Sequence, residues 1–98
     1  MILKKSAMAG TLESSDVMIT VTPNDGGGIE IDLRSDVAAQ FGNAIRETVR
    51  AVLEEMEVTD AAVTVLDHGA LDCAIRARTR CAVCRGAEAK YDWSREDG

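Results

Sequence analysis

Three segments of the chain alternate between apolar and polar positions, a pattern typical of β-strands with one buried face. In residues 17–22, VMITVT, the β-branched Val17, Ile19 and Val21 fall on one face. Residues 29–34, IEIDLR, alternate in the same way and carry charge on the opposite face. The same pattern predicts strands over the segments AAVTVLD, residues 61–67, and, with weaker alternation, AMAGTL, residues 7–12.

Turn-forming residues separate these strands. PNDGGG, residues 23–28, predicts a loop, and we expect it to join residues 17–22 and 29–34 as a hairpin. Its glycines open no helix, so it does not have the pattern of a phosphate-binding loop. ESSD, residues 13–16, is rich in side chains that bond to nearby backbone groups and favour turns. With a strand on each side, ESSD is predicted to be a hairpin tip that exposes its two serines.

Apolar residues at three- and four-residue steps predict two amphipathic helices. Ser35 takes the N-cap position of the first, Asp36 lies in its first turn, and the helix runs to about residue 57. Its apolar stripe comprises Val37, Phe41, Ala44, Ile45, Thr48, Val49, Val52 and Met56. After a turn at His68, the second helix is marked by Leu71, Ala74, Ile75, Ala82 and Val83.

The predicted order is strand, strand, strand, helix, strand, helix, in a chain of 98 residues. This length suits a single domain, residues 1–98. The simplest packing is a two-layer α+β fold, with both helices on one face of a small, mostly antiparallel sheet of about four strands. We expect an ordered core over about residues 7–89 and a polar tail over 90–98 that contains Tyr91 and Trp93.

The charge balance narrows the choice of partners. With 17 acidic against 11 basic residues, the formal net charge is −6. Such a surface repels phosphate backbones, which argues against nucleic acid, and suits basic protein surfaces. No apolar run reaches the length of a membrane span, and MILKKSAMAG lacks the apolar core of a signal peptide. We therefore expect a cytoplasmic protein with no membrane partner.

Few side chains offer chemistry of their own. Cys73, Cys81 and Cys84 share a helical face, which predicts small buried hydrophobes and reduced thiols. The Cys81-x-x-Cys84 pair lies late in its helix, not at the start where the dipole would lower a thiol pKa. With His68, the cysteines form no familiar zinc spacing. His68 could act as a general base for Ser14, but its turn position favours a polar surface residue. We predict neither a catalytic residue nor a metal site, and hence a subunit whose chemistry is supplied elsewhere.

The hydroxyls in ESSD have the features of a substrate rather than of a nucleophile. An enzyme nucleophile usually sits in a cleft beside a base, whereas a hairpin tip faces solvent. Glu13 and Asp16 make the local potential more negative, which is unsuitable for the capture of free phosphate. An exposed serine between carboxylates instead suits recognition by a modifying enzyme.

Three segments resemble a known family, the acyl carrier protein (gamma subunit) of citrate lyase. AGTLESSDVMI, residues 9–19, resembles its modification-site segment, and GALDCAIRARTR, residues 69–80, resembles its second helix. QFGNAIRETV, residues 40–49, resembles its first helix. The resemblance runs from about Ala9 to Arg80 and does not extend to the tail.

The resemblance implies that the serine after TLE, Ser14, carries a covalent 2'-(5''-phosphoribosyl)-3'-dephospho-CoA arm, with Ser15 as the alternative. The thiol of this arm would bear acetyl and citryl thioesters while citrate is cleaved to acetate and oxaloacetate. The implied partners are the alpha (acyl-transferase) and beta (citryl lyase) subunits and a prosthetic-group transferase.

The arginines of the second helix have two interpretations. They compensate the helix dipole and aid solubility, or they form a patch that holds a phosphate or the acidic groups of a partner. Because the implied arm carries several phosphates, we predict that Arg76 and Arg80, one turn apart, contact them, with Arg78 on the other side as the alternative.

Other functions stay open at this stage. The carrier subunit of malonate decarboxylase bears the same group on a serine in a GSGD-like turn, and here LESSD and GALDC favour the citrate enzyme. An unmodified assembly subunit would use ESSD as a plain turn. A small metal or redox module would be built on Cys81 and Cys84.

Overall fold

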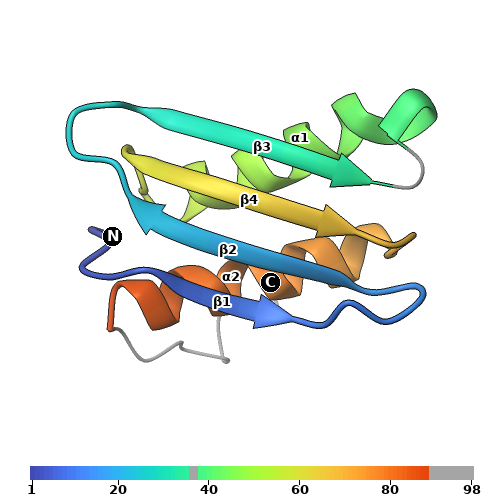
Figure 1. Ribbon diagram of the computed structural model, residues 1–98. Helices are drawn as coiled ribbons and strands as arrows, with labels where there is room; N and C mark the ends of the chain where they lie inside the picture. Colours follow the sequence, from blue (N-terminus) through green and yellow to red (C-terminus); the bar gives the residue numbers. More distant parts are fainter. Residues whose placement is uncertain (36–37, 89–98) are drawn as a thin grey trace.

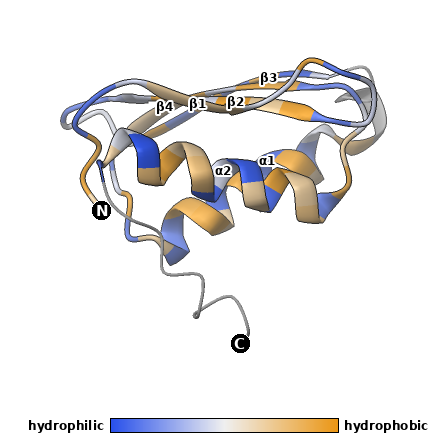
Figure 2. Ribbon diagram, turned by 90° about the horizontal axis from the view of Figure 1, so that it is seen from below, coloured by the Kyte–Doolittle hydropathy of each residue, from blue (hydrophilic) through white to orange (hydrophobic). Residues whose placement is uncertain are grey.

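The computed structural model describes residues 1–35 and 38–88 (Figure 1). Both helices cover the same face of a single sheet, and the edge-on view in Figure 2 separates the two layers. The predicted α+β fold and its order of elements are confirmed. These elements are β1 (Ala7–Gly10), β2 (Val17–Pro23), β3 (Ile29–Ser35), α1 (Ala38–Glu55), β4 (Ala61–Asp67) and α2 (Asp72–Gly86).

The strand pairing corrects one prediction. The sheet order is β1-β2-β4-β3, with β2 antiparallel to both neighbours and β3 parallel to β4. The predicted hairpin of residues 17–22 with 29–34 is therefore wrong, because β4 lies between these strands. Residues 24–28 pass over the end of β4, a span of about 10 Å at the usual strand spacing, which a loop of this length covers. The helix α1 supplies the crossover that the parallel pair β3–β4 requires.

The side chains of the strands explain why β4 is central and β3 lies at an edge. Its inward-facing Ala61, Val63 and Val65 are buried, and its other side chains carry no charge before Asp67. The outward-facing positions of β3 are instead Glu30, Asp32 and Arg34, all exposed. Charged side chains are common on edge strands, where they discourage pairing with other chains.

The core between sheet and helices is aliphatic among the described residues. Buried valines and isoleucines of the sheet pack against α1 and α2. The main contributors are Val17, Ile19, Val21, Val63 and Val65 from the strands, Val49 and Leu53 from α1, and Ile75 and Val83 from α2.

Some helix predictions need correction, and others are not tested. Ser35 ends β3 and its hydroxyl donates to the Asp67 carboxylate (2.7 Å), while its predicted N-cap role depends on residues outside the described part of the chain and stays a prediction. Phe41 and Leu71, predicted to be core residues, are 53% and 73% exposed. A groove between the starts of the two helices separates these side chains from the core. Predictions for Asp36, Val37 and the tail with Tyr91 and Trp93 lie outside the described residues.

The N-terminal segment packs against the end of α2. Leu3 is buried, and the N–H groups of Lys4 and Lys5 both donate to the carbonyl of Gly86 (2.9 and 3.2 Å). Across residues 1–35 and 38–88, neither helix has the length and apolar character needed to cross a bilayer.

Candidate functional site

The candidate site is the tip of the β1–β2 hairpin, residues 11–16. The Asp16 N–H donates to the Glu13 carbonyl (3.2 Å) and closes a four-residue turn with both serines at its centre. Ser14 and Ser15 are exposed, as the sequence predicted. Ser15 has φ +63°, the left-handed conformation that a type II turn places at its third position. Ser14 takes the second position, which most residues occupy without strain.

Backbone hydrogen bonds fasten this tip to the end of β4. The Ser15 N–H donates to the His68 carbonyl (2.8 Å), and the His68 N–H donates to the Asp16 carbonyl (2.9 Å). These bonds extend the β2–β4 ladder beyond its last pair, Val17 with Asp67. His68 thus meets the tip through its main chain, and the serines stand on a fixed turn.

Gly10, at the end of β1, allows the hairpin to close tightly. Its φ is +101°, and a Cβ at this position would overlap the carbonyl oxygen of Val17. Only glycine accommodates both this dihedral angle and this close approach.

Asp16 is the most highly bonded side chain of the tip. Its carboxylate accepts hydrogen bonds from the Thr11 hydroxyl (2.5 Å), the Val17 N–H (2.7 Å) and the Arg78 guanidinium through Nη2 (3.0 Å) and Nε (3.3 Å). Together these donors lower the pKa of Asp16 to about 2, with Thr11 contributing most. Because Arg78 belongs to α2, the network joins the hairpin to the helix layer.

The other arginines of α2 point to different partners. Arg76 pairs with Asp72 one turn earlier (2.8 Å), and Arg80 pairs with Glu55 of α1 (3.1 Å). Arg85 donates to the carbonyl of Met8 on the edge strand β1 (2.7 Å). Of the three arginines weighed for phosphate contact, Arg78 is thus the one bonded to the tip, and the contact predicted for Arg76 and Arg80 stays a prediction.

Comparison with known proteins identifies the family. The family model described as malonate decarboxylase delta subunit (MdcD), an acyl carrier model, matches residues 4–86. The citrate lyase acyl carrier protein of Latilactobacillus sakei subsp. sakei is 52% identical over 92 residues, 93% of this chain and 90% of that protein. The Vibrio cholerae citrate lyase acyl carrier protein is 53% identical over 89 residues, 90% and 91% of the two chains. This chain belongs to the citrate lyase acyl carrier protein family.

The fold of this carrier also occurs in a solved assembly. One chain in the crystal structure of a Pseudomonas malonate decarboxylase hetero-tetramer in complex with malonate superposes with a TM-score of 0.71. The match covers 84% of each chain at 17% identity, so the likeness concerns the fold.

The cysteines of the carrier differ from one another in exposure. Cys84 is buried as predicted, Cys81 is half-buried against the core, and Cys73 is exposed, so the predicted core role is wrong for Cys73. Cys73 lies in the first turn of α2, beside the exposed Leu71 and Asp72, where the helix does not face the core. Burial, and then the neighbouring Cys81, raise the pKa of the Cys84 thiol. In the described part of the chain, no cluster of His, Cys, Asp or Glu has the arrangement of a metal site.

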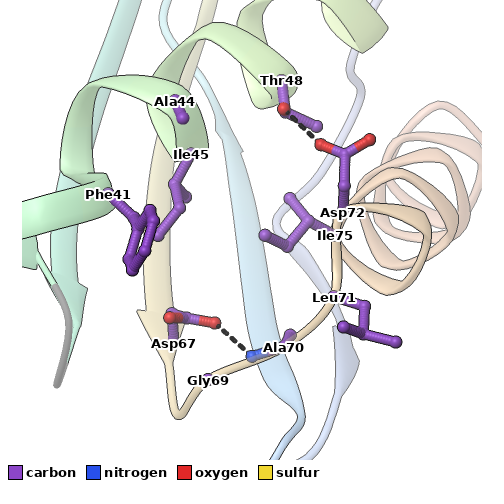
Figure 3. Close-up of a pocket in the computed structure, with 10 residues that line it drawn as sticks. All are labelled: Phe41, Ala44, Ile45, Thr48, Asp67, Gly69, Ala70, Leu71, Asp72 and Ile75. Atoms are coloured by element: carbon purple, nitrogen blue, oxygen red, sulfur yellow. Dashed lines mark hydrogen bonds between the residues drawn. The ribbon is translucent and has the colours of Figure 1, made fainter.

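A groove of about 380 Å³ is the second notable feature of the carrier (Figure 3). It lies between the starts of α1 and α2 and is closed at one side by the β4–α2 connection. Thr48 and Asp72 bond across it (2.6 Å), and this bond, with Arg76, lowers the pKa of Asp72. Its lining residues are Phe41, Ala44, Ile45, Thr48, Asp67, Gly69, Ala70, Leu71, Asp72 and Ile75.

Sequence reasoning did not find the Thr11–Asp16–Arg78 network. Arg78 is 62 residues from Asp16, and no local pattern connects them. The usable signal was weak: two acidic residues at the tip, Glu13 and Asp16, and three arginines at alternate positions of the second helix.

Proposed function

We propose that this chain is the carrier subunit of a citrate lyase complex and that Ser14 holds its prosthetic group. The observation that carries the proposal is the exposed hydroxyl of Ser14 at the second position of a fixed turn. Ser15 is less suited, because its backbone is in the left-handed conformation and its N–H is bound to His68. A transferase can therefore enclose Ser14 without disturbing the sheet.

The residues of the tip fit a phosphodiester-linked group, for which we propose 2'-(5''-phosphoribosyl)-3'-dephospho-CoA. A guanidinium has more N–H donors than the two that Arg78 uses on Asp16, so it can also serve a phosphate oxygen. We favour Arg78 over Arg76 and Arg80 for this contact, because its partner Asp16 lies at the hairpin tip, whereas the partners of the other two, Asp72 and Glu55, belong to the helices.

In this function, the chain's own residues hold and present the arm. When attached, the group supplies a terminal thiol that carries the acyl group as a thioester. Attachment at Ser14 keeps that end at an effective concentration of about millimolar near each partner site, without release to bulk solvent. The backbone hydrogen bonds from the Ser15 N–H to the His68 carbonyl and from the His68 N–H to the Asp16 carbonyl hold the turn from which the arm leaves the domain. A carrier of this kind requires no acid or base of its own.

The partners we propose are the alpha and beta subunits of citrate lyase and the transferase that attaches the arm. A net charge of −6 suits docking onto basic surfaces, and the exposed Glu13 gives the transferase a carboxylate to recognise beside Ser14. We place this assembly in the cytoplasm, in keeping with three free cysteines.

Intact mass measurements test the attachment site. We expect the protein from a host that makes citrate lyase to carry the mass of the group and to lose it in mild alkali. Ser14→Ala should fold and stay at the unmodified mass, whereas the matched control Ser15→Ala should still gain the group. An adduct mapped to Ser15 would overturn the site but not the carrier function, and the absence of any adduct would overturn both.

The carrier subunit of malonate decarboxylase is the second candidate, favoured by the description of the matching family model and by the superposed structure. Combining the loaded carrier with the partner subunits of each enzyme separates the two. Oxaloacetate formed from citrate supports the first, and carbon dioxide released from malonate supports the second.

A further inference from the structure

The groove between the helix starts opens at the same end of the molecule as Ser14. One loop connects the two features: Asp67 and Gly69 line the groove, and His68 between them binds the backbone of Ser15 and Asp16. The groove and the proposed attachment site are thus neighbours across this loop.

The polar groups of the groove are satisfied within the protein. The Asp67 carboxylate is only 2% exposed and accepts hydrogen bonds from the Ser35 hydroxyl (2.7 Å) and the Ala70 N–H (2.9 Å). Asp72 is bonded to Thr48 and Arg76. Two carboxylates beside a groove disfavour a phosphate ligand, so a neutral ligand suits the site better.

The remaining lining is apolar. Ile45 and Ile75 form its buried side, and Ala44 stands at its edge. Phe41 and Leu71, both large apolar side chains that are exposed, flank it, as the side chains in Figure 3 show. Covering this surface with methylene or methyl groups is favourable, because it removes apolar area from water.

We propose that this groove receives the apolar end of the chain's own arm, namely pantetheine methylenes and the acetyl thioester, while no partner subunit holds it. The proposal rests on the proposed function. Because the arm is tethered next to the groove at an effective concentration of about millimolar, even a millimolar dissociation constant leaves the groove about half occupied. A thioester in the groove is less accessible to hydroxide, so the carrier protects its own acyl group.

The rate of spontaneous thioester hydrolysis tests this protection. Hydroxide adds to the acetyl carbonyl carbon, the C–S bond breaks, and the proton of the acetic acid so formed passes to the sulfur, which leaves acetate and the free arm thiol. On acetyl-loaded carrier of confirmed mass, we expect hydrolysis at least about twofold slower than on free acetyl-CoA at the same pH, as half occupancy requires. Ala44→Trp fills the groove and should restore the rate of free acetyl-CoA.

Ala51→Trp is the matched control. Ala51 is exposed on the same helix, two turns after Ala44 on the same side, but does not line the groove. The Ala51→Trp carrier should hydrolyse its thioester as slowly as the wild type. Equal rates for wild-type carrier and free acetyl-CoA would overturn the proposal and leave the carrier function intact, because the mass measurement has already established the attached arm.

A second measurement needs no variant, so a folding defect in Ala44→Trp does not matter. With ¹³C-acetyl on the arm, we expect the Ile45 and Ile75 methyl signals of wild-type carrier to shift on loading and to show contacts to the acetyl methyl. Unshifted signals would overturn the proposal. If Ala44→Trp hydrolyses its thioester at the slow wild-type rate but binds the partner subunits more weakly, the proposal is likewise overturned, and the groove is assigned to partner docking.

Discussion

Two adjacent serines share the hairpin turn, and the backbone gives them different surroundings. Ser15 is held in the left-handed region with its N–H on His68, whereas Ser14 occupies the open corner of the turn. Residue types alone could not distinguish the two, because both are small, polar and common in turns. The distinction arises from main-chain hydrogen bonds to a segment more than 50 residues away in the sequence, which a local pattern does not reveal.

Gly10 gives a prediction at the residue scale. Gly10→Ala should reduce the free energy of unfolding by about 2 kcal/mol or more, because it combines backbone strain with an overlap on the Val17 carbonyl. Gly26→Ala is the control: Gly26 also has a positive φ, but a Cβ there meets nothing within 4 Å, so only the strain, about 1 kcal/mol, applies. Urea unfolding of both variants measures the difference. Equal losses would show that the overlap is relieved at no cost.

Asp16 gives a prediction about pH. Its pKa is about 2 in the folded chain against an ordinary value of 3.8, so the folded state binds the proton more weakly than the unfolded state. The resulting stabilisation is complete above about pH 4 and is lost as the pH falls toward 2. Asp16→Asn should therefore show a shallower fall in unfolding free energy over this interval. Thr11→Val removes the hydrogen bond that lowers this pKa most, so it should move the Asp16 carboxyl titration seen by NMR upward. An unmoved midpoint would contradict the assigned cause.

At the scale of elements, α2 illustrates what periodicity predicts and what it leaves open. Apolar spacing predicted that this helix exists, but not which neighbours its side chains contact. Arg78 binds the hairpin, Arg80 binds α1, and Cys84 enters the core, so different faces of the helix contact different neighbours. The strands behaved likewise: alternation predicted each of them, but loop composition did not indicate that β4 would enter between β2 and β3. Pairing depends on long-range burial, which short patterns do not encode.

The thiols of α2 should react in the order of their exposure. With iodoacetamide on the folded protein, we expect Cys73 to be alkylated first, Cys81 more slowly, and Cys84 only as the protein unfolds. Burial slows the alkylation of Cys84 in two ways: it limits access of the reagent, and it raises the pKa of the thiol, so less of the reactive thiolate is present. Timed quenching and peptide mass analysis give the order. Modification of Cys84 as fast as Cys73 in the folded state would contradict the packing of this helix.

At the scale of the whole molecule, the functional features gather at one end. The hairpin tip, the end of β4 and the starts of both helices all lie there (Figure 1), and the groove is lined by residues of the same segments. The sequence predicted the layers and the exposed tip, since both follow from local patterns. It did not predict the groove, because the apolar spacing assigned Phe41 and Leu71 to the buried faces of helices, whereas both side chains are exposed and Leu71 lies just before the start of α2.

The opposite end is closed by the N-terminal segment. Leu3 is 6% exposed, and Leu3→Ala should lower the free energy of unfolding by about 2–4 kcal/mol through lost burial and a cavity. Ile2, which is 82% exposed, is the neighbouring control, and Ile2→Ala should stay within about 0.5 kcal/mol of wild type. Thermal or urea unfolding checks the pair. Equal effects would mean that the segment does not pack on α2 in solution.

The length of β2 also indicates where the protein can be labelled or immobilised. The strand runs from the tip at Val17 to the loop after Pro23, so the two ends are about 20 Å apart. Asp25 is exposed in that distant loop. A dye or a surface linkage introduced through Asp25→Cys, in a chain whose reactive Cys73 has been replaced, would leave the serines unobstructed. Single-molecule records could then follow the free end of the arm while the body of the carrier stays fixed to glass.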